Sequence, residues 1–176
     1  MAYNFGVMAG ALVGALIGVL FVVIFFKLSN KNHSTKTEYD ERQNIERGKA
    51  YMIGYWVESG LLMALMLFAL GDIELPLEPA VLYGTVLLVS ITVLSVISIF
   101  KGAFWGLNNN KKSYMIMLLV VAAINIISPV IAISNGEMVE NGKLQAPFIN
   151  LMCGILFVAV MVALIVRNIA DKRAED

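Results

Sequence analysis

The sequence predicts an all-α protein, namely a polytopic transmembrane helical bundle of five spans with the N-terminus outside and the C-terminus inside. Its composition is the first reason: 59% of the 176 residues are apolar and 15% are charged, whereas a soluble domain is about a quarter charged. Five apolar stretches are each long enough to cross a hydrocarbon core of about 30 Å as a helix. The third reason is that the basic residues gather on one side of these stretches.

The predicted spans alternate with segments that are too polar to lie in lipid. We expect the spans at residues 6–28, 50–70, 80–100, 113–134 and 148–166 of a single membrane domain. Nothing in these stretches alternates between polar and apolar residues, as transmembrane β-strands would. The first stretch has no basic residue before it and is longer than the apolar run of a signal peptide, so we expect a retained helix.

The distribution of basic residues predicts the orientation in the membrane. With the N-terminus outside, 12 of the 13 Lys and Arg residues fall at the cytosolic side, and only Lys143 falls outside. Cytosolic segments of membrane proteins carry such an excess of Lys and Arg. We therefore expect a multi-pass protein of the cell (inner, cytoplasmic) membrane, with the lipid bilayer as its surroundings.

The composition also excludes several function classes. Basic and acidic residues balance at 13 each, so no basic field points to nucleic acid as a partner. One cysteine, Cys153, and one histidine, His33, exclude an intrachain disulfide framework and a His-rich or thiolate metal site. Because the chain also lacks phosphate-binding and hydrolase motifs, we expect no enzymatic activity, metal or cofactor.

The first span places a glycine at every fourth position. One side of this helix is therefore nearly bare of side chains, and helices in lipid associate through such close backbone contact. The row predicts tight helix packing, against another span of the chain, a second copy or a partner protein. Its members are Gly6, Gly10, Gly14 and Gly18.

Glu58 is the one ionisable side chain well inside a span. It follows Tyr51 and Tyr55 at helical spacing, so the three residues form a polar stripe on one face of the second span. A bare carboxylate at that depth is costly, so we expect it to be protonated, hydrogen-bonded or lining a wet cavity. An intramembrane carboxylate is a functional-site hypothesis by default.

Two further spans offer polar neighbours for Glu58. Thr92 and Ser95 share a face of the third span, and Asn125 and Ser128 lie near the middle of the fourth. Pro129 removes the amide that would bond to the Asn125 carbonyl, which frees a polar group there. These side chains predict either a small polar cavity that binds a ligand or interhelical hydrogen bonds that fix the packing.

The segment 29–49 is the longest polar stretch and is expected to be a cytoplasmic loop with a short juxtamembrane helix. Thr35 with Glu38 three residues later fits a capping box, which predicts a helix from about residue 37 that runs toward, or continues into, the second span. Glu38 with Arg42 and Arg42 with Glu46 are spaced as ion pairs of that helix.

Within this segment, Asp40, Glu41, Arg42 and Gln43 form a compact charged motif before a span. A short D-E-R-Q motif in this place resembles one found in small, uncharacterised multi-span membrane proteins of Gram-positive bacteria. The resemblance covers only this segment and implies a bacterial inner-membrane protein, with no chemistry to carry over. The motif either grips a partner on the cytoplasmic side or is a solvated helix start.

The outer loops are short and acidic. Asn141-Gly142 between Val139 and Leu144 is a strong hairpin signal, so we expect a small hairpin there. Neither outer loop is long enough to form a domain.

Together these features favour an accessory or regulatory membrane subunit without enzymatic activity. It would bind another membrane protein, or itself, through the glycine row and the charged cytoplasmic segment. The alternative is a transporter of a small substrate or of protons, or a substrate-binding membrane subunit, that uses a polar cavity around Glu58.

Overall fold

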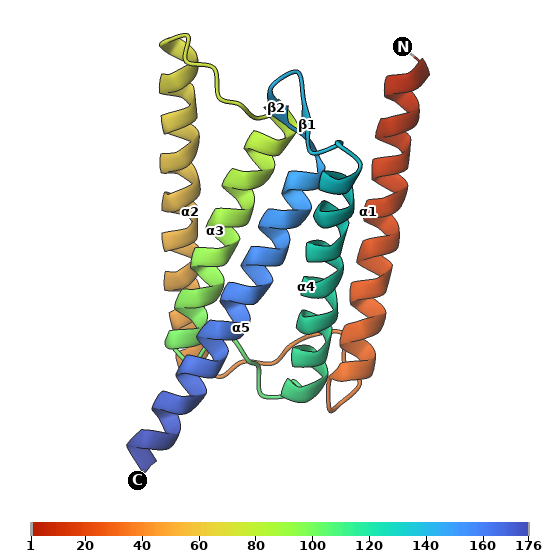
Figure 1. Cartoon of the computed structure of the whole chain (residues 1–176). Coiled ribbons are helices and arrows are strands. Elements are labelled where there is room, and N and C mark those ends of the chain that lie inside the picture. Colours follow the sequence, from red (N-terminus) through yellow and green to blue (C-terminus); the bar gives the residue numbers. More distant parts are fainter. Residues whose placement is uncertain (1, 176) are drawn as a thin grey trace.

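The computed structural model describes the backbone of residues 2–175 and the side chains of residues 9, 10 and 12–173. Within these residues the chain forms five long helices that alternate in direction and are apolar enough to span a membrane (Figure 1). The prediction of an all-helical chain with five such helices is confirmed. They are α1 (Ala2–Ser29), α2 (Glu41–Leu70), α3 (Pro79–Phe100), α4 (Lys111–Ser134) and α5 (Pro147–Glu175).

All five helices are longer than the predicted spans, and α2 and α5 exceed them most. The polar residues 41–49 continue into the apolar span as one helix, so α2 begins at Glu41. Helix α5 continues past residue 166, and its last turns extend beyond the other helices (Figure 1). Lys172 and Arg173 lie in its last turn, where positive charge favours the helix dipole.

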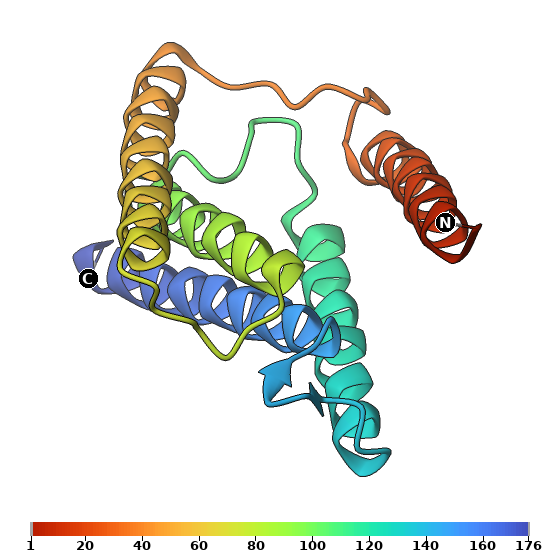
Figure 2. The same cartoon turned by 90° about the horizontal axis from the view of Figure 1, so that it is seen from above.

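Four helices pack in a row in the order α2, α3, α5 and α4 (Figure 2). One glycine lies at each of the three contacts. A Cβ atom on Gly54 would lie 3.2 Å from Leu94 Cβ, and one on Gly84 would lie 3.3 Å from Ile149 Cδ1. At the contact of α4 with α5, a Cβ atom on Gly154 would lie 2.8 Å from Ile126 Cγ1. Close backbone approach through small residues is the usual basis of helix association in lipid.

Helix α1 stands apart from this row along most of its length (Figure 2). Leu16, Ile17 and Val19 point in different directions around the helix, yet each is 61–66% exposed. A Cβ atom on Gly10, Gly14 or Gly18 would meet nothing within 4 Å. The predicted glycine row therefore packs against no described part of this chain, and Gly6 lies outside the residues whose surroundings are described.

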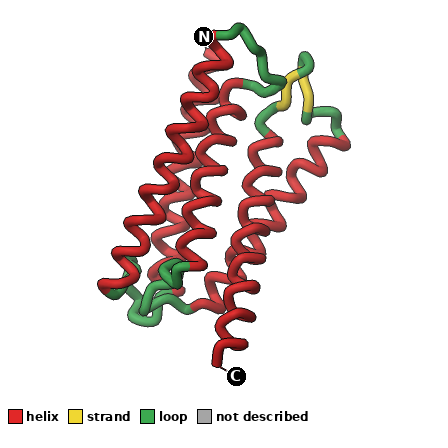
Figure 3. Tube along the Cα trace, turned by 90° about the vertical axis from the view of Figure 1, so that its left-hand side faces the viewer, coloured by secondary structure: helices red, strands yellow, loops and turns green. Residues whose placement is uncertain are grey.

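The α4–α5 loop forms the predicted hairpin, at the end of the bundle opposite the last turns of α5 (Figure 3). Strand β1 (Val139–Glu140) pairs antiparallel with β2 (Lys143–Leu144). Asn141 and Gly142 both have positive φ, as a tight two-residue turn requires. The hairpin is tied to the preceding loop by a hydrogen bond from Leu144 N to Pro76 O at 2.9 Å.

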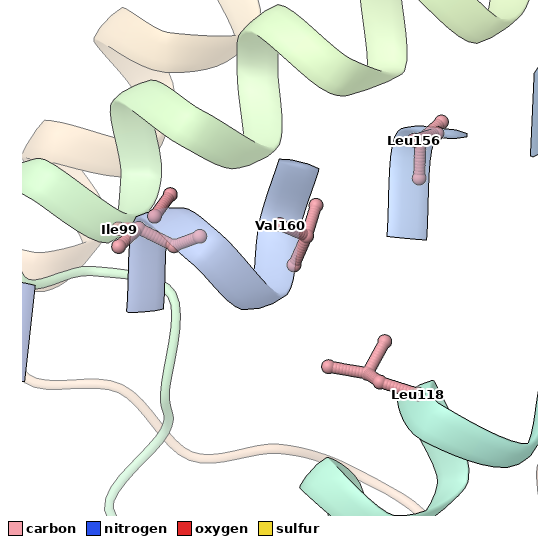
Figure 4. Packing of buried hydrophobic residues seen from close by; sticks show 5 residues of the cluster. Ile99, Leu118, Leu156 and Val160 are labelled. Atoms are coloured by element: carbon pink, nitrogen blue, oxygen red, sulfur yellow. The ribbon is translucent and has the colours of Figure 1, made fainter. Parts of the chain in front are cut away.

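The buried apolar cluster lies where α3, α4 and α5 meet. Ile99 of α3 and Leu118 of α4 point toward Leu156 and Val160 of α5 (Figure 4). The sides of the helices that face away from their neighbours carry exposed aliphatic side chains, as lipid-facing surfaces do. Cys153 is a half-buried free thiol on α5.

Candidate functional site

The densest polar region joins two loops at the end of the bundle opposite the hairpin. One is the α1–α2 loop and the other is the α3–α4 loop, and their contacts reach into the first turn of α2 and of α4. We call the polar contacts between residues 30–43 and 101–114 the interlock. The surrounding end of the molecule, which we call the basic end, is formed by residues 29–49, 101–112 and 167–173.

Asn30 lies at the centre of the interlock and is 2% exposed. Its Oδ1 accepts hydrogen bonds from Asn109 Nδ2 at 2.8 Å and from the Tyr114 hydroxyl at 2.9 Å. Its own Nδ2 donates to Ser34 O at 2.7 Å. A buried amide is costly unless it is hydrogen-bonded, and here both ends of the amide are satisfied.

Asn108 holds the second half of the α1–α2 loop. Its Nδ2 donates to Lys36 O at 2.9 Å, and its Oδ1 accepts from Glu38 N at 2.9 Å. Leu107 N donates to Glu38 O at 2.8 Å, so the backbone of Glu38 is bonded on both sides. A Cβ atom on Gly106 would lie 2.6 Å from Glu38 O, so only glycine fits there without displacement.

This pairing explains why the predicted helix start is wrong. Residues 37–40 are not helical and lie against the α3–α4 loop, so no helix begins near residue 37 and Thr35 does not cap one. The cap is Asp40, whose carboxylate accepts from Gln43 N at 2.7 Å while Gln43 Oε1 accepts from Asp40 N at 3.2 Å. The capping box is thus shifted by five residues.

The D-E-R-Q motif makes most of its bonds within the chain. Gln43 is buried, and its Nε2 donates to Gly102 O at 3.2 Å and to Trp105 O at 3.0 Å. Arg42 reaches Lys101 O at 3.4 Å, while Glu41 is exposed. The motif therefore fastens the start of α2 to the α3–α4 loop.

The predicted ion pairs of the juxtamembrane helix do not form. Glu46 pairs with Lys49 at 2.7 Å instead of Arg42. Glu38 accepts from Asn32 Nδ2 at 2.7 Å, because it lies in the extended segment before the helix. The interlock bonds displace both expected pairs.

Arg47 and Tyr39 extend the interlock by one turn of α2. The Arg47 guanidinium lies 4.0 Å from the centre of the Tyr39 ring and donates to Ala103 O at 3.4 Å. Such a cation over an aromatic face is attractive. Burial raises the pKa of Tyr39, and Arg47 opposes that rise only partly, so the phenol is neutral at physiological pH.

Helix α1 is attached to the bundle through this end. Phe25 and Phe26 pack on Tyr114 of α4, with ring centroids 5.0 and 5.8 Å apart. Asn110 N donates to Ser29 O at 3.2 Å. The attachment point and the exposed glycine face are therefore at different levels of the same helix.

The predicted polar residues around Glu58 lie on separate helices. Glu58 is half-buried on α2, and Tyr55 one turn before it is 63% exposed. Thr92 and Ser95 lie on the neighbouring α3, but the Thr92 hydroxyl donates to Leu88 O of its own helix at 2.7 Å. Among the described side chains, Glu58 forms no salt bridge.

Asn125 and Ser128 lie on α4, from which α2 is separated by α3 and α5 (Figure 2). The Asn125 amide donates to Val121 O at 2.9 Å within α4. Ser128 accepts from Asn150 Nδ2 of α5 at 3.1 Å, which is an interhelical hydrogen bond. The structure does not bring these residues together with Glu58.

Sequence reasoning missed the amides that build the interlock. Asn30 ends the first span, and the run Asn108-Asn109-Asn110 precedes the fourth. The available signal was three successive asparagines beside a membrane span, because amides are costly there without partners. No local pattern, however, relates residue 30 to residue 109.

The fold and these contacts are the basis for any functional assignment. No protein-family model matches the chain, and neither a curated protein nor a solved structure is significantly similar to it.

Proposed function

We propose that the protein is a non-enzymatic accessory or regulatory subunit of the cell membrane. It binds a transmembrane helix of a partner membrane protein against the glycine face of α1, defined by Gly10, Gly14 and Gly18. The supporting observation is that a Cβ atom on this face would meet nothing within 4 Å in the part of the chain that the structure describes, although the helix is anchored at the basic end.

Lipid provides no hydrophobic force that would drive two transmembrane helices together. Lipid chains are as apolar as leucine, so an apolar helix gains little by leaving them unless its backbone can approach another helix closely. In this chain the α2–α3, α3–α5 and α4–α5 contacts each already use a glycine. The most regular small-residue face is the one without a neighbour, which favours an external helix as its occupant.

The other predicted sites support this function less well. In the D-E-R-Q motif, the side chains of Asp40, Arg42 and Gln43 form hydrogen bonds within the chain. We therefore assign docking to α1 alone. A transporter would need its polar groups around one cavity, and Glu58 and Asn125 lie on helices that do not pack together. We therefore prefer the accessory subunit to the transporter.

The test compares two substitutions on opposite sides of α1. Gly14→Leu places a large side chain on the glycine face, and Val19→Leu enlarges an exposed position on the far side. Tagged protein is crosslinked in native membranes and the bound proteins are identified. We expect Gly14→Leu to lose the partner and Val19→Leu to keep it, with equal thermal unfolding of the two purified proteins.

Two differently tagged copies in one cell distinguish a partner from a second copy of the chain. Recovery of one copy with the other, abolished by Gly14→Leu, would identify the occupant as a homo-oligomer contact. The proposal fails if no protein is recovered with the wild type, or if both variants retain the same partners.

A further inference from the structure

A pocket of about 860 Å³ lies at the basic end, between α4, α5 and the α3–α4 loop. This volume is in the range of sites that bind small molecules, about 300–1,000 Å³. The pocket is distinct from both the glycine face and the neighbourhood of Glu58.

The course of the two helices explains the pocket. Helices α4 and α5 approach closely at Gly154, where a Cβ atom would lie 3.4 Å from Asn125 O. From this crossing they diverge toward the basic end (Figure 1). The space between them is left to the α3–α4 loop and the pocket beside it.

One wall of the pocket is apolar. Met115 of α4 faces Leu164 and Ile165 of α5, and Phe104 and Trp105 of the loop complete the wall. The two aromatic rings pack edge to face, with centroids 4.9 Å apart. Tryptophan is enriched where a membrane meets water because its ring has an apolar body and a polar N–H group.

The rim of the pocket is cationic. It contains Lys31, Lys111, Lys112 and Arg167, against Asp171 as the carboxylate among the lining residues. Arg167 pairs with Asp171 at 2.9 Å, whereas the described side chains give the three lysines no salt bridge. Two of these lysines occupy the first turn of α4, where the helix dipole adds positive potential.

The contacts of Arg167 show where this rim lies along the length of the helices. Its Nη1 donates to Phe100 O, the last residue of α3, at 2.7 Å. The apolar wall thus extends from the helix ends toward the middle of the bundle, and the cations lie at the helix ends. A ligand that fits both the cationic rim and the apolar wall has an anionic head and an apolar tail.

We infer that this pocket binds an anionic phospholipid, with the phosphate between the lysines of the rim and the upper acyl chain along the apolar wall. Basic pockets between transmembrane helices recognise acidic lipid headgroups in this way. A free phosphate would share the cations but would leave the wall unused. This inference is independent of the proposed function, because α1 contributes no glycine-face residue to the pocket.

The experiment uses the full-length protein in nanodiscs of phosphatidylglycerol or of phosphatidylcholine, with retained lipid counted by native mass spectrometry. Lys111→Gln with Lys112→Gln removes two rim charges. Lys27→Gln with Lys36→Gln is the matched control, since it removes two charges near the same end but outside the pocket. Ile165→Trp fills the apolar wall without changing charge.

We expect wild type and control to retain phosphatidylglycerol in preference to phosphatidylcholine. The rim variant should lose affinity for it by about thirtyfold, from the usual contribution of two cations near an anionic lipid, and Ile165→Trp should also lose it. Unchanged thermal unfolding shows that the variants are folded.

Three results would overturn the inference. Equal retention of the two lipids would show that the site does not select for charge. Equal losses in the rim variant and the control would indicate general surface attraction. Displacement of the lipid by millimolar inorganic phosphate would indicate a site for a soluble phosphate group.

Discussion

Amide side chains make the central bonds of the interlock, and their chemistry suits the position. An amide both donates and accepts, whereas a carboxylate only accepts. Asn30 can therefore take two donors on its oxygen and still bond Ser34 O through its nitrogen. The result is a buried polar junction at the membrane edge that carries no charge.

A substitution of Gln43 tests the interlock at a single residue. Gln43→Ala removes its hydrogen bonds to Gly102 O and Trp105 O and half of the capping box. Because two acceptors are left with no partner, we expect a loss of about 1–3 kcal/mol of stability. Thermal unfolding in detergent measures it, and the exposed neighbour in Glu41→Gln is the control. Equal unfolding temperatures would contradict the assigned role.

Glu58 distinguishes the two functions that the sequence favours. If docking depends on α1, Glu58→Gln should leave partner binding unchanged, since Glu58 lies on α2 and the glycine face on α1. Crosslinking in native membranes, with Gly14→Leu as the positive control, measures this. Proton or solute flux in vesicles that vanished in Glu58→Gln would instead support the transporter.

At the level of helices, glycines differ in what surrounds them rather than in their spacing. Gly54, Gly84 and Gly154 show no regular pattern with one another, yet each lies where two helices touch. The regular row on α1 touches nothing that the structure describes. The spacing of glycines along a helix therefore indicates how closely another helix can approach it. It does not indicate which helix does so.

Gly154→Leu tests the α4–α5 contact. Its Cβ would lie 2.8 Å from Ile126 Cγ1, which is closer than carbon atoms pack, so the helices must separate. We expect a loss of about 1–3 kcal/mol, as for other overpacked interiors. The matched control is Gly60→Leu on α2, where a Cβ meets nothing within 4 Å. Equal unfolding of the two variants would show that the contact is loose.

Local patterns predicted the elements well and their partners poorly. Apolar length was sufficient for the five helices, and Asn141-Gly142 was sufficient for the hairpin. The start of α2 was mispredicted because bonds from Leu107 and Asn108 hold the backbone of Glu38 outside the helix. Those bonds depend on residues about 70 positions away, which no local pattern contains.

For the molecule as a whole, the segments expected to share the cytosol lie at one end of the bundle (Figure 3). The polar cavity predicted around Glu58, by contrast, depended on which helices pack against each other. Depth along a span can be counted from the sequence, which places Asn125 about one helical turn deeper than Glu58. The order in which the helices pack cannot be read from the sequence in this way. That order places α3 and α5 between the helix of Glu58 and the helix of Asn125.

Cysteine labelling tests the orientation of this end. In a Cys153→Ser background, Asn141→Cys lies in the hairpin and Lys36→Cys in the α1–α2 loop. Because basic segments stay in the cytosol, an impermeant maleimide on intact cells should label the first variant only. Permeabilised cells, in which both should react, provide the control. The reverse pattern would invert the assigned topology.

The bond from Asn109 to Asn30 joins positions 79 apart in the chain, and this separation sets an order for biogenesis. During synthesis, α1 is complete before the asparagines of residues 108–110 exist. Until then α1 is tethered only by its linker, with its bare side available to whatever helix is inserted nearby. A partner made at the same time would thus meet α1 before the α3–α4 loop had bonded to it.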